Sequence, residues 1–255
     1  MRNFAGFSEK FLNGHARFVF RSLKHRYMKE KIEINCVLEH LSPGDVAVDI
    51  GAYKGVYTYW MARAVGKNGK VFVFEPQALL AEYLRKIFSM PCYSMVTVEE
   101  KALSSGVGKD YIVVPESKKR YSQMAKLGSA DEQGAHVGFS YKVAVDTLDN
   151  YFSARRTGPI RFIKCDVEGH ELEVFRGACN ILRTDYPVIL FECEARHFSG
   201  QSTAEVFGFL EEIGYEGRFI SGSRMYPVRE FDEKLHQSGI SGKYINNFLF
   251  VKKRR

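Results

Sequence analysis

Short apolar runs alternate with amphipathic segments along most of this chain. The apolar runs suit strands buried on both faces, and the segments between them repeat apolar residues every three or four positions, as helices do. The predicted strands are residues 46–50, 70–74, 160–165, 187–191, 219–220 and 244–251, and a further strand is expected within residues 95–103. The predicted helices are residues 56–65, 79–87, 146–151, 172–182 and 204–213. This alternation predicts a doubly wound α/β fold with a mostly parallel sheet, the last strands closing one edge antiparallel.

Two regions depart from the alternation. Residues 1–33 are basic and aromatic and predict an N-terminal helical arm that packs on the domain at 34–255 or on a partner. Residues 104–142 form a connection too long for an ordinary loop, which is typical of a lid or substrate loop. Within it we expect an inserted hairpin that pairs residues 111–114 with 141–145.

Charge and cysteine usage narrow the class of protein. The net charge is +7, much of it near the two ends, and it would suit an anionic partner such as nucleic acid, glycan or a membrane surface. We favour a simpler interpretation, a solvated helix face and tail, because no aromatic-and-basic nucleic-acid motif accompanies the charge. The five cysteines form no C-x-x-C pair, the first residues lack the pattern of a signal peptide, and no apolar run has membrane length. We therefore expect a cytoplasmic protein without a membrane span; a homo-oligomer stays open.

Four of the predicted strands end in a carboxylate. Asp49, Glu75, Asp166 and Glu192 each follow an apolar run directly. In a doubly wound sheet the carboxyl ends of parallel strands meet at one edge, where ligands bind. Glu75, after the second strand, is placed to accept hydrogen bonds from both hydroxyls of a ribose. One acid at a strand end is often only a helix cap, but four at one edge predict a ligand site.

The turn after the first strand indicates which nucleoside ligand this is. It reads D-I-G-A-Y-K-G over residues 49–55 and lacks the three glycines of a dinucleotide-binding turn. Gly51 and Ala52 let a ligand approach the backbone closely. Asp49 would repel a pyrophosphate but suits a ligand that carries an ammonium or sulfonium. The turn therefore favours S-adenosylmethionine (SAM).

Five segments together resemble the FkbM family of SAM-dependent methyltransferases. They read SPGDVAVDIGAYKG, FVFEP, VDTLDNY, IKCDVEGHELEVFRGA and NNFLFV, and the resemblance runs from about residue 34 to 251, most specifically over 163–178. It implies a class I methyltransferase fold, with a seven-stranded sheet that has one antiparallel strand. It also implies O-methyl transfer to a hydroxyl of a saccharide, glycolipid or secondary metabolite. The family usually has Asn-Ile where this chain has Tyr53 and Lys54, which could reshape the methionine end of the pocket.

The resemblance also implies which residues bind the cofactor. The methionine end of SAM would lie on the turn after the first strand, the ribose at the acid of the second strand, and the adenine beside residues 101–103. The implied residues are Asp49, Gly51, Ala52, Tyr53, Gly55, Glu75, Pro76, Lys101, Ala102, Leu103 and Asp166.

Methyl transfer needs a group that holds a hydroxyl in line with the methyl carbon and removes its proton. The candidates are Asp166, Glu168, His170 and Glu192. Asp166 could instead contact the ammonium of SAM. His170 could instead be a solvent-facing residue in the first turn of a helix.

Several alternatives remain at the level of the sequence. Glu192, Glu194 and His197 could help to bind Mg²⁺, although we favour an acid-rich edge that binds a polar substrate without metal. The basic ends leave an RNA or protein methyltransferase as a second function. The absence of an Asn-Pro-Pro-aromatic motif after residue 165 counts against N-methylation. The third alternative is a non-catalytic scaffold that binds SAM.

Overall fold

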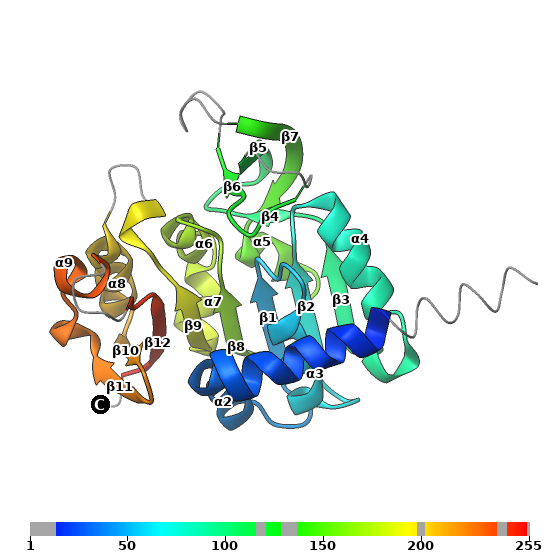
Figure 1. The fold of residues 1–255 in the computed structure, drawn as a ribbon, viewed down its shortest axis with the longest axis horizontal. Coiled ribbons are helices and arrows are strands. Elements are labelled where there is room, and N and C mark those ends of the chain that lie inside the picture. The colour runs from blue at the N-terminus through cyan, green and yellow to red at the C-terminus, as the bar shows by residue number, and fades with distance from the viewer. Residues whose placement is uncertain (1–13, 116–120, 129–136, 198–201, 239–243, 254–255) are drawn as a thin grey trace, which may run out of the picture.

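The computed structural model describes residues 14–115, 121–128, 137–197, 202–238 and 244–253. This part of the chain contains a large sheet of eight strands and a small sheet of four. Figure 1 shows the large sheet standing between layers of helices, with the small sheet above the carboxyl ends of its central strands.

The large sheet has the predicted α/β topology. Its strands are β1 (Val46–Ile50), β2 (Lys70–Phe74), β3 (Val96–Glu99), β8 (Ile160–Cys165), β9 (Val188–Glu192), β10 (Tyr215–Ser221), β11 (Arg224–Pro227) and β12 (Asn247–Lys252). They lie in the order β3-β2-β1-β8-β9-β12-β10-β11. The first five are mutually parallel, and β12 runs antiparallel to both β9 and β10.

Seven of these strands correspond to the predicted sheet, and β11 extends its edge. Gly222 has a φ of 61°, a left-handed conformation that suits glycine in a tight hairpin turn. Ser221 therefore pairs with Arg224, and β11 returns antiparallel along β10. This turn adds a second antiparallel strand at the edge.

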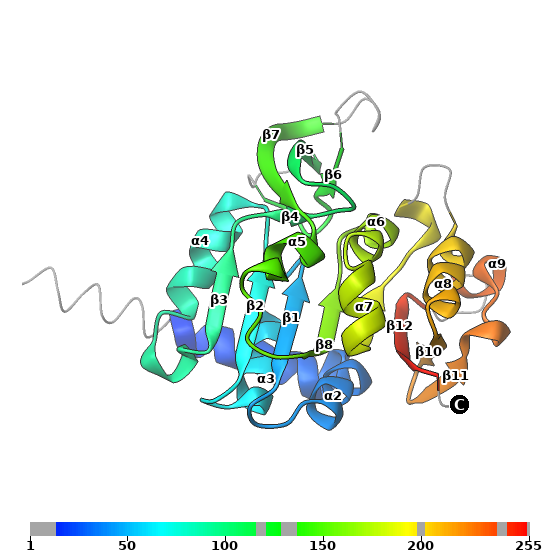
Figure 2. The same ribbon diagram turned by 180° about the vertical axis from the view of Figure 1, so that it is seen from behind.

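Helices cover both faces of the sheet. They are α2 (Lys31–His40), α3 (Val56–Val65), α4 (Ala78–Ile87), α5 (Leu148–Ser153), α6 (Glu171–Arg176), α7 (Cys179–Asp185), α8 (Thr203–Glu212) and α9 (Glu233–His236), with the short turns η1 (His25–Lys29), η2 (Pro91–Tyr93), η4 (Ala195–His197) and η5 (Val228–Glu230). α2, α3 and the arm lie on the face seen in Figure 1, and α5, α6 and α7 lie on the face seen in Figure 2. Within the described residues no helix is long and apolar enough to cross a bilayer.

The prediction of one continuous helix over residues 172–182 is wrong. The structure has two helices there, α6 and α7, because Gly177 lies against the backbone of the small sheet's connection. A Cβ atom on Gly177 would be 2.0 Å from the carbonyl oxygen of Ser104. α7 then starts anew, and the carboxylate of Asp149 accepts hydrogen bonds from the backbone N–H groups of Asn180 and Ile181.

The described part of the arm packs on its own chain. Residues 14–24 form a helix that continues into η1 and α2. Phe18 is fully buried and meets the rings of Tyr59 and Phe88 edge-on. The indole N–H of Trp60 donates to the carbonyl oxygen of Ser22 at 3.2 Å. Residues 1–13 of the predicted arm lie outside the described residues.

The inserted region forms the small sheet, in which the two predicted segments pair antiparallel, although a further short strand lies between them in the chain. Its strands are β4 (Ala102–Leu103), β5 (Gly108–Pro115), β6 (Lys126–Leu127) and β7 (Val137–Asp146), and β5 pairs antiparallel with β7. Between β5 and β6 the chain returns to the large sheet. There the amide of Gln77 donates to the carbonyl oxygen of Ser122 and accepts from its N–H, both at 2.9 Å. Residues 116–120 and 129–136 of the insertion lie outside the described residues.

Candidate functional site

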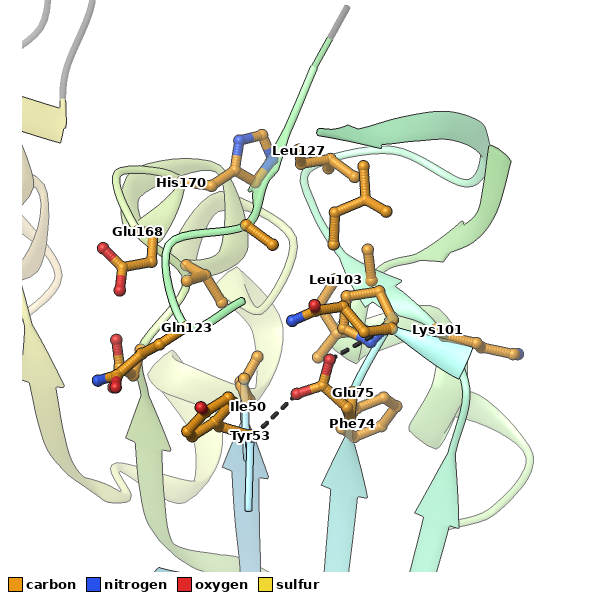
Figure 3. Close-up of a pocket in the computed structure, with 18 residues that line it drawn as sticks. Ile50, Tyr53, Phe74, Glu75, Lys101, Leu103, Gln123, Leu127, Glu168 and His170 are labelled. Atoms are coloured by element: carbon orange, nitrogen blue, oxygen red, sulfur yellow. Dashed lines mark hydrogen bonds between the residues drawn. The ribbon is translucent and has the colours of Figure 1, made fainter. Parts of the chain in front are cut away.

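The carboxyl ends of β1, β2 and β8 meet at one edge, as the acid-tipped strands predicted. The N–H of Asp166 donates to the carbonyl oxygen of Ile50 at 3.0 Å, and that of Gly51 donates to Phe74 at 2.9 Å. These bonds hold the three strand ends side by side around a first hollow of about 620 Å³. Figure 3 shows this hollow between the strand ends and the chain that leads into β6.

The structure brings most of the predicted site residues together. The first hollow is lined by Gly51, Tyr53, Glu75, Pro76, Lys101, Ala102, Leu103, Asp166, Glu168 and His170 from the predicted set. Asp49 and Ala52 line a second hollow of about 850 Å³, which shares Asp166 with the first. Glu192 lines a third hollow of about 850 Å³, which shares Glu168 with the first. Gly55 does not line any of these three hollows.

The turn after β1 needs glycine for two different reasons. Gly51 and Gly55 both have left-handed φ angles, of 76° and 73°. A Cβ atom on Gly51 would lie 1.9 Å from the carbonyl oxygen of Asp166, so Gly51 allows the turn to touch the end of β8. A Cβ atom on Gly55 would lie 2.7 Å from the side chain of Leu84 on α4. Gly51 therefore shapes the hollow, whereas Gly55 allows α3 to begin against α4.

Replacing Gly51 with alanine is expected to lower the free energy of unfolding by about 3 kcal/mol. The added methyl group strikes backbone, which cannot move aside cheaply, and the left-handed φ adds strain. Urea denaturation measures this loss. The matched control is Gly106→Ala, since a Cβ atom there meets nothing within 4 Å. Equal stability of the two variants would contradict the close approach of Gly51 to Asp166.

Glu75 is a buried carboxylate of the first hollow, and backbone groups hold both of its oxygens. Its side chain is 2% exposed, and its two oxygens accept hydrogen bonds from the N–H groups of Tyr53 at 2.8 Å and Gln77 at 2.9 Å (Figure 3). Burial raises the pKa of Glu75 to about 7, although these bonds act in the opposite direction. Each oxygen keeps a second acceptor position, so the carboxylate can bind two neighbouring hydroxyl groups.

The positive charge of a buried lysine compensates the negative charges of the acids on one face of the sheet. Side chains alternate between the two faces along a strand. The same face therefore carries residues 47 and 49 of β1 and residues 162 and 164 of β8. Asp49 accepts a hydrogen bond from Thr58, and burial raises its pKa to about 6. The Nζ atom of Lys164 lies 4.0 Å from a carboxylate oxygen of Asp166. Burial opposes the charge of Lys164, but the surrounding carboxylates outweigh it and raise its pKa.

Sequence reasoning missed Lys164 as a site residue. The signal was present, because a lysine one residue before the end of a strand predicted to be buried on both faces must find a charged partner. Its side chain is 2% exposed, and it lines the second hollow together with Asp49 and Asp166.

The loop after β8 holds Glu168 in a strained position between two hollows. Glu168 has a φ of 57°, which is rare for a residue other than glycine. The carboxylate of Glu171 stabilises the loop by accepting from the N–H of Gly169 at 3.1 Å, and burial raises the pKa of Glu171 to about 7. One carboxylate oxygen of Glu168 lies 2.8 Å from Nδ1 of His197 on η4. Glu168 therefore faces both the first and the third hollow with its orientation set by His197.

His170 lies inside the hollow, so the solvent-facing alternative is wrong. Its Nε2 atom is 2.8 Å from the hydroxyl oxygen of Ser104, and Figure 3 shows its ring beside Leu127. Burial lowers the pKa of His170, so the imidazole is neutral at pH 7. Its position and its bond to Ser104 join α6 to the inserted region.

Lys101 lines the hollow mainly with its backbone. Its ammonium group donates to a carboxylate oxygen of Asp146 at 2.9 Å, and its side chain points away from the hollow in Figure 3. This ion pair joins the residues between β3 and β4 to the end of β7. The neighbouring Ala102 and Leu103 present small and apolar groups to the hollow.

Glu192 and Glu194 share one hydrogen-bonded cluster with Asn246. The amide nitrogen of Asn246 donates to both carboxylates, and the hydroxyl of Tyr244 donates to Glu194 at 2.9 Å. Burial and the nearby Asp166 raise the pKa of Glu192, so it keeps its proton at neutral pH. Among the residues that the structure describes, no group of three or more His, Cys, Asp or Glu side chains is arranged to hold a metal ion.

The inserted region contributes lining residues that the sequence did not reveal. Gln123, Ala125 and Leu127 approach the first hollow from the chain around β6, and Ile112 approaches it from β5. Gln77 also lines the hollow and ties this segment down through Ser122. These residues carry no motif, and they meet the sheet edge only because the insertion folds back over it.

Comparisons with known proteins agree with this geometry. The structure is similar to the methyltransferase FkbM from Methylobacillus flagellatus KT, with a TM-score of 0.55 and 15% identity, over 89% of this chain and 47% of that chain. It is also similar to an O-methyltransferase from Bacillus cereus in complex with S-adenosylhomocysteine (SAH), with a TM-score of 0.50 and 13% identity, over 95% of this chain and 91% of that chain. No curated protein matches the sequence.

At these identities the solved structures establish the fold, which is that of the class I SAM-dependent methyltransferases. This chain spans about half the length of the Methylobacillus protein. The family model of the methyltransferase FkbM domain matches residues 49–216, more than half of the chain and the whole stretch from Asp49 to the start of β10. The chain therefore belongs to the FkbM methyltransferase domain family.

Proposed function

We propose that this protein is a SAM-dependent O-methyltransferase acting on a hydroxyl of a saccharide, glycolipid or secondary metabolite. The observation that carries the proposal is Glu75, a buried carboxylate at the end of β2 whose orientation is fixed by two backbone N–H groups and whose free acceptor positions face the first hollow. A ribose presents two adjacent hydroxyls that match these positions.

The other lining residues fit the remaining parts of SAM. Leu103, Ile112 and Leu127 give the first hollow an apolar end suited to adenine. Gly51 allows a ligand to lie on the backbone, and Asp49 and Asp166 supply negative charge where the second hollow begins. Bound SAM would supply a methyl group on a positively charged sulfur.

We assign the role of general base to Glu168. It is the predicted catalytic residue that lines both the first hollow and the third, so it stands where an acceptor hydroxyl would meet the methyl group. His197 orients its carboxylate. Glu192 keeps its own proton at neutral pH, and Asp166 lines the first and second hollows but not the third, where the acceptor would enter.

The third hollow suits an acceptor that is rich in hydroxyl groups. Its lining is mostly polar and aromatic: Tyr53, Tyr121, Ser122, Gln123, Met124, Glu168, Glu192, Glu194 and Arg196. Side chains of this kind hydrogen-bond sugar hydroxyls and stack on sugar rings. The hollow therefore supports a saccharide-like acceptor.

Calorimetric titration with SAM tests the cofactor, and transfer of a labelled methyl group to a panel of saccharides, glycolipids and hydroxylated metabolites tests the reaction.

We expect Glu168→Gln to keep SAM affinity while lowering methyl transfer about 100-fold, because the base is lost and the cofactor contacts remain. Glu100→Gln, at an exposed acid, is the control. Absence of SAM binding by the folded protein would contradict the proposal, and SAM binding without transfer to any acceptor would favour a scaffold.

A further inference from the structure

The outward face of the arm exposes an unusual group of large apolar side chains. Phe20, Tyr27 and Met28 are 70%, 65% and 75% exposed, and Leu23 is 37% exposed. The same helix buries Phe18 and Ser22 against the large sheet's helices. Figure 1 shows the arm, in blue, crossing the outside of the molecule over α3. A soluble monomer seldom clusters apolar side chains on one exposed helix unless that helix binds something.

Positive charges accompany these apolar groups. Arg17 and Lys24 are exposed on the same segment, and Lys29 is exposed at its end, where it also borders the second hollow. No Asp or Glu occurs between residues 14 and 29. This exposed helix face combines apolar side chains with positive charges and carries no negative charge. It is complementary to a surface with an anionic outer layer and an apolar interior.

We propose that this arm face, residues 17–29, lies in the interface of a bilayer that contains anionic lipid. The apolar side chains would enter the boundary between headgroups and acyl chains, and the cations would contact lipid phosphates. A second copy of the chain is a poorer partner, because two such faces would oppose cation to cation. Nucleic acid is also a poorer partner, because phosphate contacts would leave the apolar side chains in water.

The arm also connects this surface to the proposed site. Arg21, His25 and Lys29 line the second hollow beside Asp49 and Asp166. A bilayer against the outer face of the arm would therefore lie next to this opening. If the proposed function holds, this position favours a lipid-borne acceptor, such as a glycolipid, over a free metabolite.

Vesicle flotation with the full chain tests the proposal. We expect binding to phosphatidylcholine vesicles that contain about one third phosphatidylglycerol, little binding to pure phosphatidylcholine, and weaker binding as salt is raised. The variant Phe20→Ser/Met28→Ser should bind at least about tenfold more weakly, because two apolar side chains no longer enter the interface. The matched control is Leu79→Ser/Val107→Ser, at side chains that are 48% and 65% exposed elsewhere on the surface.

Vesicle binding is measured without methyl transfer. A protein that does not bind vesicles could still be a methyltransferase, and a protein that does not transfer methyl groups could still bind vesicles. Equal binding to neutral and anionic vesicles, or an arm variant that binds like the control variant, would overturn the proposal. So would a dimer in solution that the arm variant dissociates, or binding to RNA without binding to vesicles. Unchanged thermal unfolding of the arm variant shows that its loss of binding is not a loss of fold.

Discussion

Replacing Glu75 with glutamine is expected to weaken SAM binding about 100-fold. The carboxylate offers two acceptor positions to the ribose, and each charge-assisted hydrogen bond is worth more than a neutral one. A glutamine amide also turns a donor toward the N–H of either Tyr53 or Gln77, so one of the bonds that orient the side chain is lost. Calorimetric dissociation constants measure the effect.

The pH dependence of SAM binding gives this prediction a second readout. The pKa of Glu75 is raised to about 7, so in the native protein its carboxylate gains a proton as the pH falls from 8 to 6 and loses acceptor capacity. SAM affinity should therefore fall over that range, and Glu75→Gln should lose this part of the dependence. The unliganded fold binds that proton more tightly than the unfolded chain does. Its stability should therefore decrease as pH rises toward 7, and the thermal shift caused by SAM should be larger at pH 8 than at pH 6.

The control for Glu75 is Glu100→Gln, at an exposed acid that is paired with Arg85 outside the hollow. It should leave SAM affinity unchanged. A Glu75→Gln variant that binds SAM as well as the control variant would remove the main support for a ribose at this position.

Replacing Lys164 with methionine is expected to lower the free energy of unfolding by about 4 kcal/mol. Methionine fills a similar volume, but the change leaves the buried Asp49 and the partly buried Asp166 without their compensating cation. Urea denaturation at pH 8, above the raised pKa of about 6 of Asp49, gives the size of the loss. Lys142→Met, at an exposed lysine on β7, is the matched control.

A double variant separates charge from packing at this position. Lys164→Met/Asp166→Asn removes both charges of the pair and should recover part of the lost stability, because the uncompensated carboxylate is gone. If the double variant is as unstable as the sum of the two single variants, Lys164 does not stabilise the fold through Asp166. The same variants should bind SAM weakly, since both residues border the second hollow.

Local pattern was enough to predict the elements of the large sheet. The bounds of β1, β2, β8 and α3 agree with the predicted ones, because continuous apolar runs and helical spacing are properties of consecutive residues. The placement of these strand ends at one edge also followed, since parallel strands that alternate with helices must bring their carboxyl ends together. Only the structure showed that Glu75 and Asp166 line the first hollow, whereas Asp49 lines the second. The break between α6 and α7 did not follow, because it depends on the contact of Gly177 with Ser104, far away in the sequence.

What the amino-acid order determined by itself was the α/β class, the acid-tipped edge and the family motifs, all of which depend on neighbouring residues or on a regular topology. Only the tertiary structure decided that Gly55 packs on α4, that His170 bonds to Ser104, and that Glu168 is oriented by His197. The same is true of Lys164 among its acids and of the insertion folded over the hollow. The physical reason is that the partner of a buried polar group is set by which distant segments pack together, and hydrophobic periodicity does not encode that choice.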